Sequence, residues 1–339
     1  MESRTFGGLG QVSALTLGGG GIAQIWGATT REECVATVHA AVEAGIDWLD
    51  VAPSYGAGEA ERVVGEAFAG ASPAGVRIST KCQLGNPPAA EVYDRLRASL
   101  LESLERTRLD HVDLYLLHNM ITPDGWLPPG ITVAAASEIA GTPRAGTPRT
   151  LFVEAVRPAF ERLVSEGLAR AWGITGIGIP ASVIETLGEV PAPAAVQCIT
   201  NLLDSPGGLK RYEGAARPRA IIEAANASGL VGSGGVGVMG IRAVQAGALT
   251  DAIDRALPEG SPDLADYERA APFRALAHEL GESTAALAHR YALSMPGVST
   301  VVLGVKNREE LEECVAAEAR GPLDAALMAR IDAVVGRRG

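Results

Sequence analysis

Four side chains able to perform acid/base chemistry stand in, or just after, short apolar runs. Asp50 lies in the run 46–51 and Tyr55 follows it. Lys81 ends the run 76–81, and His118 ends the run 111–118. A lysine ammonium favours the phenolate of a nearby tyrosine, whose ordinary pKa is about 10. A buried aspartate would keep that lysine charged and oriented.

This combination of side chains suits hydride transfer to a carbonyl group. Negative charge then develops on the carbonyl oxygen and has to be stabilised and protonated. His118 can hydrogen-bond that oxygen while Tyr55 supplies the proton. Each residue also has an ordinary interpretation: a helix cap for Asp50, a packed turn for Tyr55, a solvated strand end for Lys81 and a core histidine for His118. Their joint position at successive strand ends favours a shared site.

The elements that would position these residues alternate regularly along the chain. Strands and helices take turns, which is typical of a parallel sheet, and eight strands are the number that closes a barrel. We therefore expect a single (β/α)8 TIM barrel domain spanning 1–339, with the strand ends meeting at one rim. A doubly wound open sheet is the alternative. The expected strands are one near Leu15 and those at 46–51, 76–81, 111–118, 169–175, 194–197, 236–239 and 300–303. The expected helices are 31–44, 58–69, 89–107, 150–166, 180–187, 217–228, segments between 263 and 294, 308–319 and 322–335.

The ends and loops of this pattern carry further information. Residues 4–21 predict an N-terminal hairpin followed by a strand that ends in the glycines 18–21, which do not form a GxGxxG fingerprint. Two long connections, 119–149 and 202–216, follow strands and should hang over the C-terminal face of the barrel. The first, with Trp126 and two adjacent prolines, is expected to form a lid or substrate wall. The alternative is a disordered insert without a role.

Composition excludes several classes of protein. Charged residues make up 20% of the 339 residues and the net charge is -11, without a basic cluster for nucleic acid. No membrane span or signal peptide is indicated, so we expect a cytoplasmic protein. Cys34, Cys82, Cys198 and Cys314 are scattered, and neither a metal site nor a disulfide framework is expected.

The sequence resembles the aldo-keto reductase superfamily over nearly its whole length. The resemblance is carried by the motifs Gly-Leu-Gly-Gln-Val-Ser at 8–13, Asp-Val-Ala-Pro-Ser-Tyr-Gly at 50–56, Ile-Ser-Thr-Lys at 78–81 and Asp-Leu-Tyr-Leu-Leu-His at 113–118. It implies a (β/α)8 barrel and an NAD(P)H cofactor lying extended across the C-terminal face. It also implies a catalytic tetrad of Asp50, Tyr55, Lys81 and His118. Segments 237–249 and 303–308 resemble a bacterial branch that includes aldose dehydrogenases.

The same resemblance implies contacts to the nicotinamide half of the cofactor. Gln197 should bind the carboxamide, with help from Thr175, although Gly176 replaces the usual asparagine. After the seventh strand, Ile241 stands where an aromatic residue normally stacks on the ring. Arg242 has two equal interpretations, a contact to the cofactor diphosphate or a rim charge. Gly19 and Gly240 complete the expected set.

The adenosine half should lie over Gly304, Lys306 and Arg308, at the N-terminus of a helix. Lys306 favours NADP(H) over NAD(H), because it matches a position that faces the 2′-phosphate. Glu310 opposes that preference, because its carboxylate would repel the 2′-phosphate. Glu313 matches an acidic adenine contact, and the neighbouring cysteine replaces the usual asparagine.

Trp26, Trp126 and Trp48 are candidates for apolar contacts to substrate. The substrate, an aldehyde, a ketone or an aldose at its anomeric carbon, stays open, as do the direction of reaction and a possible homo-oligomer. A cofactor-binding regulatory or scaffolding subunit is the alternative function. An aldolase or hydrolase using Lys81 as a Schiff-base amine is disfavoured, because its expected neighbours suit acid/base work.

Overall fold

The computed structural model describes residues 1–132, 135–228 and 235–337. Its centre is a closed barrel of eight strands in the order β3, β4, β5, β6, β9, β10, β11 and β12, with β12 paired to β3. All neighbouring strands are parallel. The predicted (β/α)8 TIM barrel is therefore confirmed and the open sheet is excluded. The strands are β3 Leu15–Gly18, β4 Trp48–Asp50, β5 Arg77–Cys82, β6 Leu114–Leu117, β9 Trp172–Thr175, β10 Ala195–Ile199, β11 Gly237–Ile241 and β12 Thr300–Leu303.

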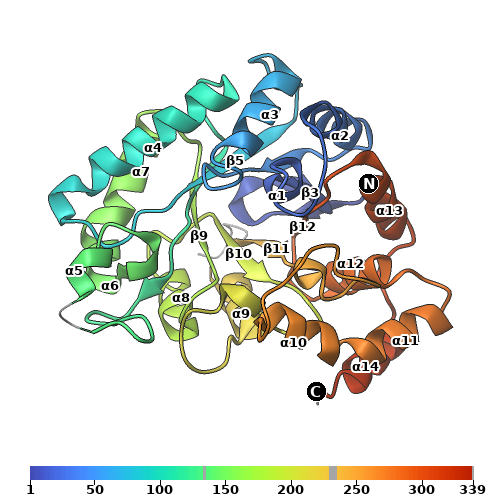
Figure 1. The fold of residues 1–339 in the computed structure, drawn as a ribbon. Coiled ribbons are helices and arrows are strands. Elements are labelled where there is room, and N and C mark those ends of the chain that lie inside the picture. The colour runs from blue at the N-terminus through green and yellow to red at the C-terminus, as the bar shows by residue number, and fades with distance from the viewer. Residues whose placement is uncertain (133–134, 229–234, 338–339) are drawn as a thin grey trace.

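Helices surround the barrel on its outside (Figure 1). In the described part of the chain, four of them begin where a polar side chain caps a free backbone amide: Thr30, Ser283, Asn307 and Asp324. One predicted helix, 150–166, is interrupted by a π-helical turn, η5. The helices are α1 Gly19–Ile22, α2 Arg31–Glu43, α3 Glu59–Phe68, α4 Val92–Thr107, α5 Ala136–Ile139, α6 Arg149–Leu151, η5 Phe152–Val156, α7 Arg157–Ser165, α8 Pro180–Leu187, α9 Pro218–Ala227, α10 Pro262–Arg269, α11 Ala271–Glu279, α12 Thr284–Ser294, α13 Arg308–Ala319 and α14 Ala325–Val334.

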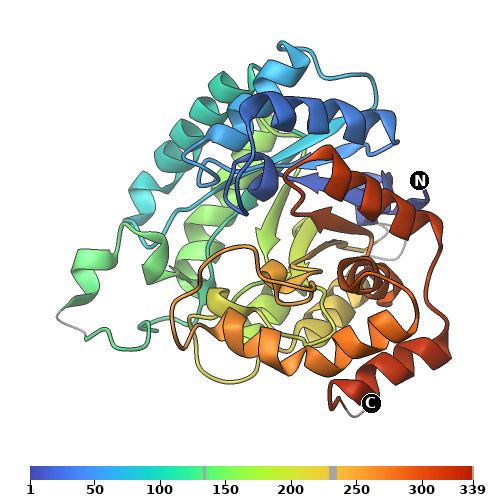
Figure 2. The ribbon, with the colours of Figure 1, turned by 45° about the vertical axis from the view of Figure 1, so that its right-hand side comes forward.

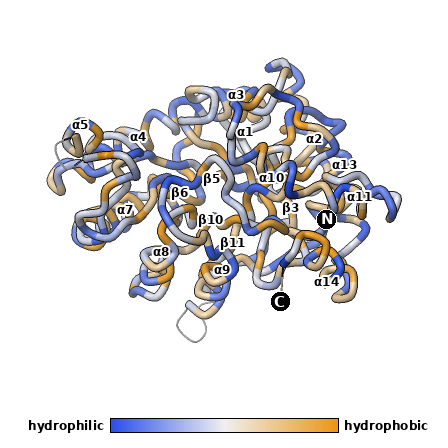
Figure 3. The backbone as a smooth tube through the Cα atoms, turned by 60° about the horizontal axis from the view of Figure 1, so that its bottom comes forward, coloured by the Kyte–Doolittle hydropathy of each residue, from blue (hydrophilic) through white to orange (hydrophobic). Residues whose placement is uncertain are grey.

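The main core lies between the barrel wall and this ring of helices. On α4, for example, Leu96 and Leu100 are buried while Arg95 is exposed. Figure 3 shows this alternation as orange and blue stretches along the helices. No helix in the described part of the chain is long and apolar enough to cross a membrane. The four cysteines are free and buried.

The predicted N-terminal hairpin is present and fills one end of the barrel. Strands β1 Ser3–Thr5 and β2 Gln11–Ser13 pair antiparallel. Phe6, at the tip, is fully buried and packs with Trp48 and other barrel-interior side chains. The expected strand ending in four glycines is wrong in detail, because Gly19–Ile22 forms the helical turn α1. Gly21 there lies so close to the Val305 carbonyl that no Cβ would fit.

Both predicted long connections are tied to neighbouring segments, 202–216 through the Ser205 hydroxyl, which donates to Asp266. In the first, β7 Ile121–Thr122 pairs in parallel with β8 Thr147–Pro148. Thr147 donates to the Gly85 carbonyl at 2.9 Å, and Asn119 accepts from the Gly85 amide at 3.2 Å. The described residues of this connection are therefore ordered, unlike the disordered insert considered as an alternative. A third long connection, 242–261, follows β11 and was not predicted from the sequence.

Candidate active site

Asp50 and Lys81 form a buried ion pair at the carboxyl ends of neighbouring strands. Strands β4 and β5 are in register, so the Lys81 Nζ lies 2.7 Å from Asp50 Oδ2 and 2.9 Å from the Val51 carbonyl oxygen. The Lys81 side chain is 0% exposed to solvent and the Asp50 side chain 2%. Burial alone would lower the pKa of Lys81, but the Asp50 carboxylate and the Tyr55 hydroxyl outweigh it and the pKa is raised. The amine is therefore an ammonium at neutral pH.

Ser79 contacts this pair and Trp48 contacts Ser79, and neither was expected to support the pair. The Ser79 hydroxyl donates to Asp50 Oδ1 at 2.7 Å and accepts from the Trp48 indole at 3.0 Å. Ser79 stands two residues before Lys81 in one strand, so both side chains point to the same face. This spacing of two residues is the signal in the sequence that could have identified Ser79 as a neighbour of the pair. Trp48 itself was a candidate substrate contact, and this is wrong because it packs on Phe6 inside the lower barrel.

Tyr55 lies directly above the Lys81 ammonium. It follows β4 in a tight loop whose Gly56 has φ +59, with no room for a Cβ beside the Ala23 carbonyl. The Lys81 Nζ is 4.6 Å from the centre of the Tyr55 ring. Burial raises the pKa of Tyr55, and this effect exceeds the lowering by Lys81. From the sequence, only the lowering of this pKa by the Lys81 charge is expected. The phenol is therefore protonated at neutral pH and can act as a proton donor.

His118 faces Tyr55 from the end of β6. The two rings meet edge to face, with 5.8 Å between their centres. Burial, with a smaller effect of the Lys81 charge, lowers the pKa of His118 to about 3. The imidazole is therefore neutral and has a single N–H to donate. Its Nδ1 is buried without a hydrogen-bond partner. The four predicted catalytic residues are thus brought together, as a buried Asp50–Lys81 ion pair, a protonated phenol and a neutral imidazole.

Gln197 and Thr175 lie side by side on strands β10 and β9. Both are nearly inaccessible to solvent, with exposed fractions of 2% and 6%. The Gln197 amide nitrogen has the Met239 sulfur as its neighbour at 3.8 Å, and a thioether is a weak acceptor. The amide therefore keeps hydrogen-bonding capacity for a polar ligand group such as a carboxamide.

Arg242 lies at the end of β11, after Gly240 and the half-buried Ile241. Its guanidinium donates to Asp263 at 2.6 Å and to Gln245 at 2.8 Å. Burial lowers its pKa despite the Asp263 carboxylate. Of the two interpretations of Arg242, this arrangement supports the structural one, because its charge is already paired within the protein.

The basic residues expected at the adenosine end also have internal partners. Lys306 Nζ contacts Asp254 at 3.1 Å and also contacts Glu310. Arg308 pairs with Glu33, which accepts from the Arg308 backbone amide as well. Asn307 caps the first turn of α13. The helix N-terminus is therefore already occupied by acceptors. Glu313 accepts a hydrogen bond from Ser283, and Gly304 is exposed.

Comparison with known proteins decides the family. The model of the Aldo/keto reductase family matches residues 14–335. This chain belongs to the aldo/keto reductase family. An L-galactose dehydrogenase from Arabidopsis thaliana is 26% identical over 332 residues, which cover 94% of this chain and 88% of that protein. An NADH-specific methylglyoxal reductase from Escherichia coli is 29% identical over 136 residues, 36% of this chain and 41% of that protein.

A solved structure has the same fold as this aldo/keto reductase. It is a glycerol dehydrogenase from Gluconobacter oxydans, 20% identical, with a TM-score of 0.69 over 98% of this chain and 94% of that chain. Together the family and its relatives support an NAD(P)-dependent carbonyl oxidoreductase.

Trp26 and Gly19 occupy the rim of this aldo/keto reductase on the β3 side. The Trp26 indole packs against Gly20, and the Arg255 guanidinium lies 5.2 Å from its centre. Gly19 packs against the Tyr55 ring, so a Cβ there would lie 3.1 Å from a ring carbon and would press on the phenol. Trp126 is half-buried in a turn closed by its own amide and the Pro123 carbonyl. The roles of both tryptophans in substrate binding stay predictions.

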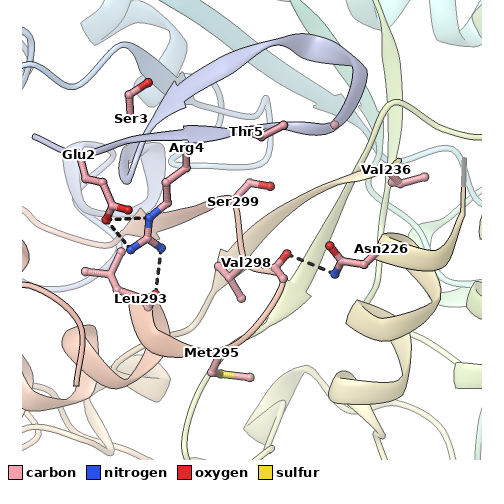
Figure 4. A pocket seen from close by; sticks show the side chains of 12 residues that line it. Glu2, Ser3, Arg4, Thr5, Asn226, Val236, Leu293, Met295, Val298 and Ser299 are labelled. Atoms are coloured by element: carbon pink, nitrogen blue, oxygen red, sulfur yellow. Dashed lines mark hydrogen bonds and ion pairs between the residues drawn. The ribbon is translucent and has the colours of Figure 1, made fainter. Parts of the chain in front are cut away.

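A cavity of about 390 Å³ lies at the opposite end of the barrel. It is lined by the N-terminal hairpin and by residues that precede β11 and β12 (Figure 4). Arg4 is held there by Glu2 and by the Leu293 carbonyl. Figure 2, turned from the first view, shows the hairpin beside α13. This cavity is separate from the tetrad.

Proposed function

We propose that this protein interconverts a carbonyl compound and an alcohol by hydride transfer, with Tyr55 as the general acid and base. The observation that carries the proposal is the buried Asp50–Lys81 pair, whose ammonium lies 4.6 Å from the centre of the Tyr55 ring. A nicotinamide cofactor, when bound, supplies or accepts the hydride. The overall reaction is carbonyl + NAD(P)H + H⁺ giving alcohol + NAD(P)⁺, or its reverse.

The side chains divide the remaining work. The neutral His118 donates its N–H to the carbonyl oxygen and orients it. Tyr55 gives its phenolic proton to the same oxygen as negative charge develops there. Lys81 stabilises the resulting phenolate, and Asp50 keeps Lys81 charged and fixed. In the oxidative direction the phenolate takes the proton from the alcohol.

The nicotinamide end of a cofactor fits the residues present. Gln197 has an amide with only a weak internal partner, and Thr175 lies beside it. The two would hold the carboxamide, with Gly240 and Ile241 at the adjoining strand end. Arg242 would contact the diphosphate only after leaving Asp263.

The expected preference for NADP(H) rests on Lys306. Its ammonium faces two carboxylates, Asp254 and Glu310. A 2′-phosphate at Lys306 would replace one of them and face the other, which disfavours a second anion. This arrangement weighs against NADP(H), so the proposed cofactor is NAD(P)H with the preference decided by these three residues.

The substrate is proposed to be a small aldehyde, ketone or aldose. The relatives named as an L-galactose dehydrogenase and a methylglyoxal reductase suggest sugar oxidation and reduction of a small dicarbonyl. The acidic composition gives no footprint for nucleic acid, and the buried free cysteines suit a reducing, cytoplasmic compartment. A homo-oligomer is compatible with this function.

The first experiment follows the absorbance of NADPH and of NADH with methylglyoxal, aromatic aldehydes and ketones, and that of NAD⁺ and NADP⁺ with aldoses. Turnover in either direction supports the proposal. Tight cofactor binding without turnover, with Tyr55→Phe indistinguishable from the natural protein, would favour the regulatory subunit instead.

A further inference from the structure

A hydrogen-bonded chain connects the lower barrel to the catalytic ammonium. It runs from the Trp48 indole to the Ser79 hydroxyl at 3.0 Å, and from that hydroxyl to Asp50 Oδ1 at 2.7 Å. An indole N–H can only donate, so Ser79 accepts from it and turns its own proton toward the carboxylate. All three side chains are buried.

The indole at the start of this chain is packed by the Phe6 ring and by the Arg77 side chain. The Phe6 ring packs against it edge to face, with 5.1 Å between the ring centres. The Arg77 guanidinium covers it at 4.6 Å from its centre. Arg77 is in turn held by Asp47 at 3.0 Å and by the Leu9 carbonyl at 3.1 Å. The N-terminal hairpin and the start of β5 therefore determine where the indole N–H points.

The carboxylate at the end of the chain is held at both oxygens. Asp50 Oδ1 accepts from Ser79 and Oδ2 accepts from Lys81. We propose that Ser79 and Trp48 are positioning residues, which hold the Asp50 carboxylate, and through it Lys81, in place for proton transfer at Tyr55. This inference rests on the proposed function, because its effect is read at Tyr55.

The test replaces Ser79 by alanine. Without the hydroxyl, the carboxylate is free to rotate, its contact with Lys81 loosens, and the ammonium is held less closely beside Tyr55, so it stabilises the phenolate less. Tyr55 then ionises at higher pH. We expect kcat to fall about tenfold, the lower end of what a hydrogen bond to a charged group contributes, with KM nearly unchanged. The basic limb of the pH profile should move upward.

A second variant, Trp48→Phe, keeps the ring packing and removes only the N–H. The Ser79 hydroxyl is then free to turn to the Leu49 carbonyl, 3.4 Å away. We expect a shift of the pH profile in the same direction and of smaller size. If Ser79 and Trp48 had only structural roles, the two variants would not shift the pH profile in the same direction with the larger shift in Ser79→Ala.

The matched control is Thr16→Val. The Thr16 hydroxyl is also buried in the barrel and lies 2.8 Å from the Thr300 hydroxyl, on strands β3 and β12. Thr16→Val removes a buried hydroxyl away from the tetrad, so it should lower Tm and leave kcat and the pH profile unchanged. If Ser79→Ala behaves in the same way, Ser79 is only structural and the inference is overturned.

The inference is separable from the proposed function. If the natural protein turns over no substrate, the proposed function fails, and the phenolate absorbance of Tyr55 is titrated as the difference between the natural protein and Tyr55→Phe. An upward shift of that titration in Ser79→Ala still supports the positioning chain. Identical titrations would overturn it.

Discussion

The Nζ of Lys81 lies 2.7 Å from Oδ2 of Asp50, and neither side chain is more than 2% exposed to solvent. Such a pair is expensive to break, because the remaining charge stays buried without a partner. The pair is also the support of the proposed proton donor, so its stability and its chemistry can be tested separately.

We expect Asp50→Asn to destabilise the fold by about 3–5 kcal/mol, since it leaves the Lys81 ammonium uncompensated. The double variant Asp50→Leu with Lys81→Met should recover most of that loss while remaining inactive. Urea unfolding of the single and double variants measures both values. A double variant as unstable as Asp50→Asn would contradict the account.

Tyr55→Phe should keep the fold and the cofactor affinity and lose the proton donor. General acid catalysis contributes about 10²–10⁴-fold, so kcat should fall by a factor in that range. Steady-state kinetics, with cofactor binding followed by fluorescence as the control, test this. A variant with full turnover would exclude Tyr55 as the acid.

The neutral His118 should make the fold sensitive to acid. Its pKa is lowered from 6.5 to about 3 in the folded protein, so below pH 6.5 the unfolded chain binds a proton that the folded chain does not. Stability should therefore fall by about 1.4 kcal/mol per pH unit from this group alone, over the window between those two values.

This effect is measured as the loss of unfolding free energy between pH 7 and pH 5. The natural protein should lose about 2 kcal/mol more than His118→Gln, which has no proton to gain. The comparison cancels other titrating groups, including the buried His289, whose pKa is also lowered by burial. Equal losses in the two proteins would show that His118 is accessible to protons.

Cofactor preference should respond to the carboxylates around Lys306. Glu310→Gln and Asp254→Asn each remove one negative charge beside the ammonium. We expect the ratio of NADPH to NADH affinity to rise about tenfold, equivalent to about 1.4 kcal/mol. Glu309→Gln, an exposed neighbour in α13, is the matched control. If the ratio is unchanged in both variants, the adenosine 2′-phosphate of NADPH does not bind at Lys306.

The alternation of apolar runs and helical segments was sufficient to predict the barrel, its single rim and the convergence of Asp50, Tyr55, Lys81 and His118. These depend on local periodicity and on the geometry of parallel strands, which the sequence carries directly. The N-terminal hairpin was predictable for the same reason. The helical turn at 19–22 was not, because Gly21 there packs against the Val305 carbonyl, a contact between segments far apart in the sequence.

Only the tertiary structure decided the partners of the charged side chains. These side chains form ion pairs between segments that are separated in the sequence. The pairs are Lys306–Asp254, Arg308–Glu33 and Arg242–Asp263. The tertiary structure also decided the pKa of Tyr55, which burial raises by more than the Lys81 charge lowers it. The physical reason is the same in each case: electrostatic energies depend on distance and solvent exposure, which exist only once the chain is folded.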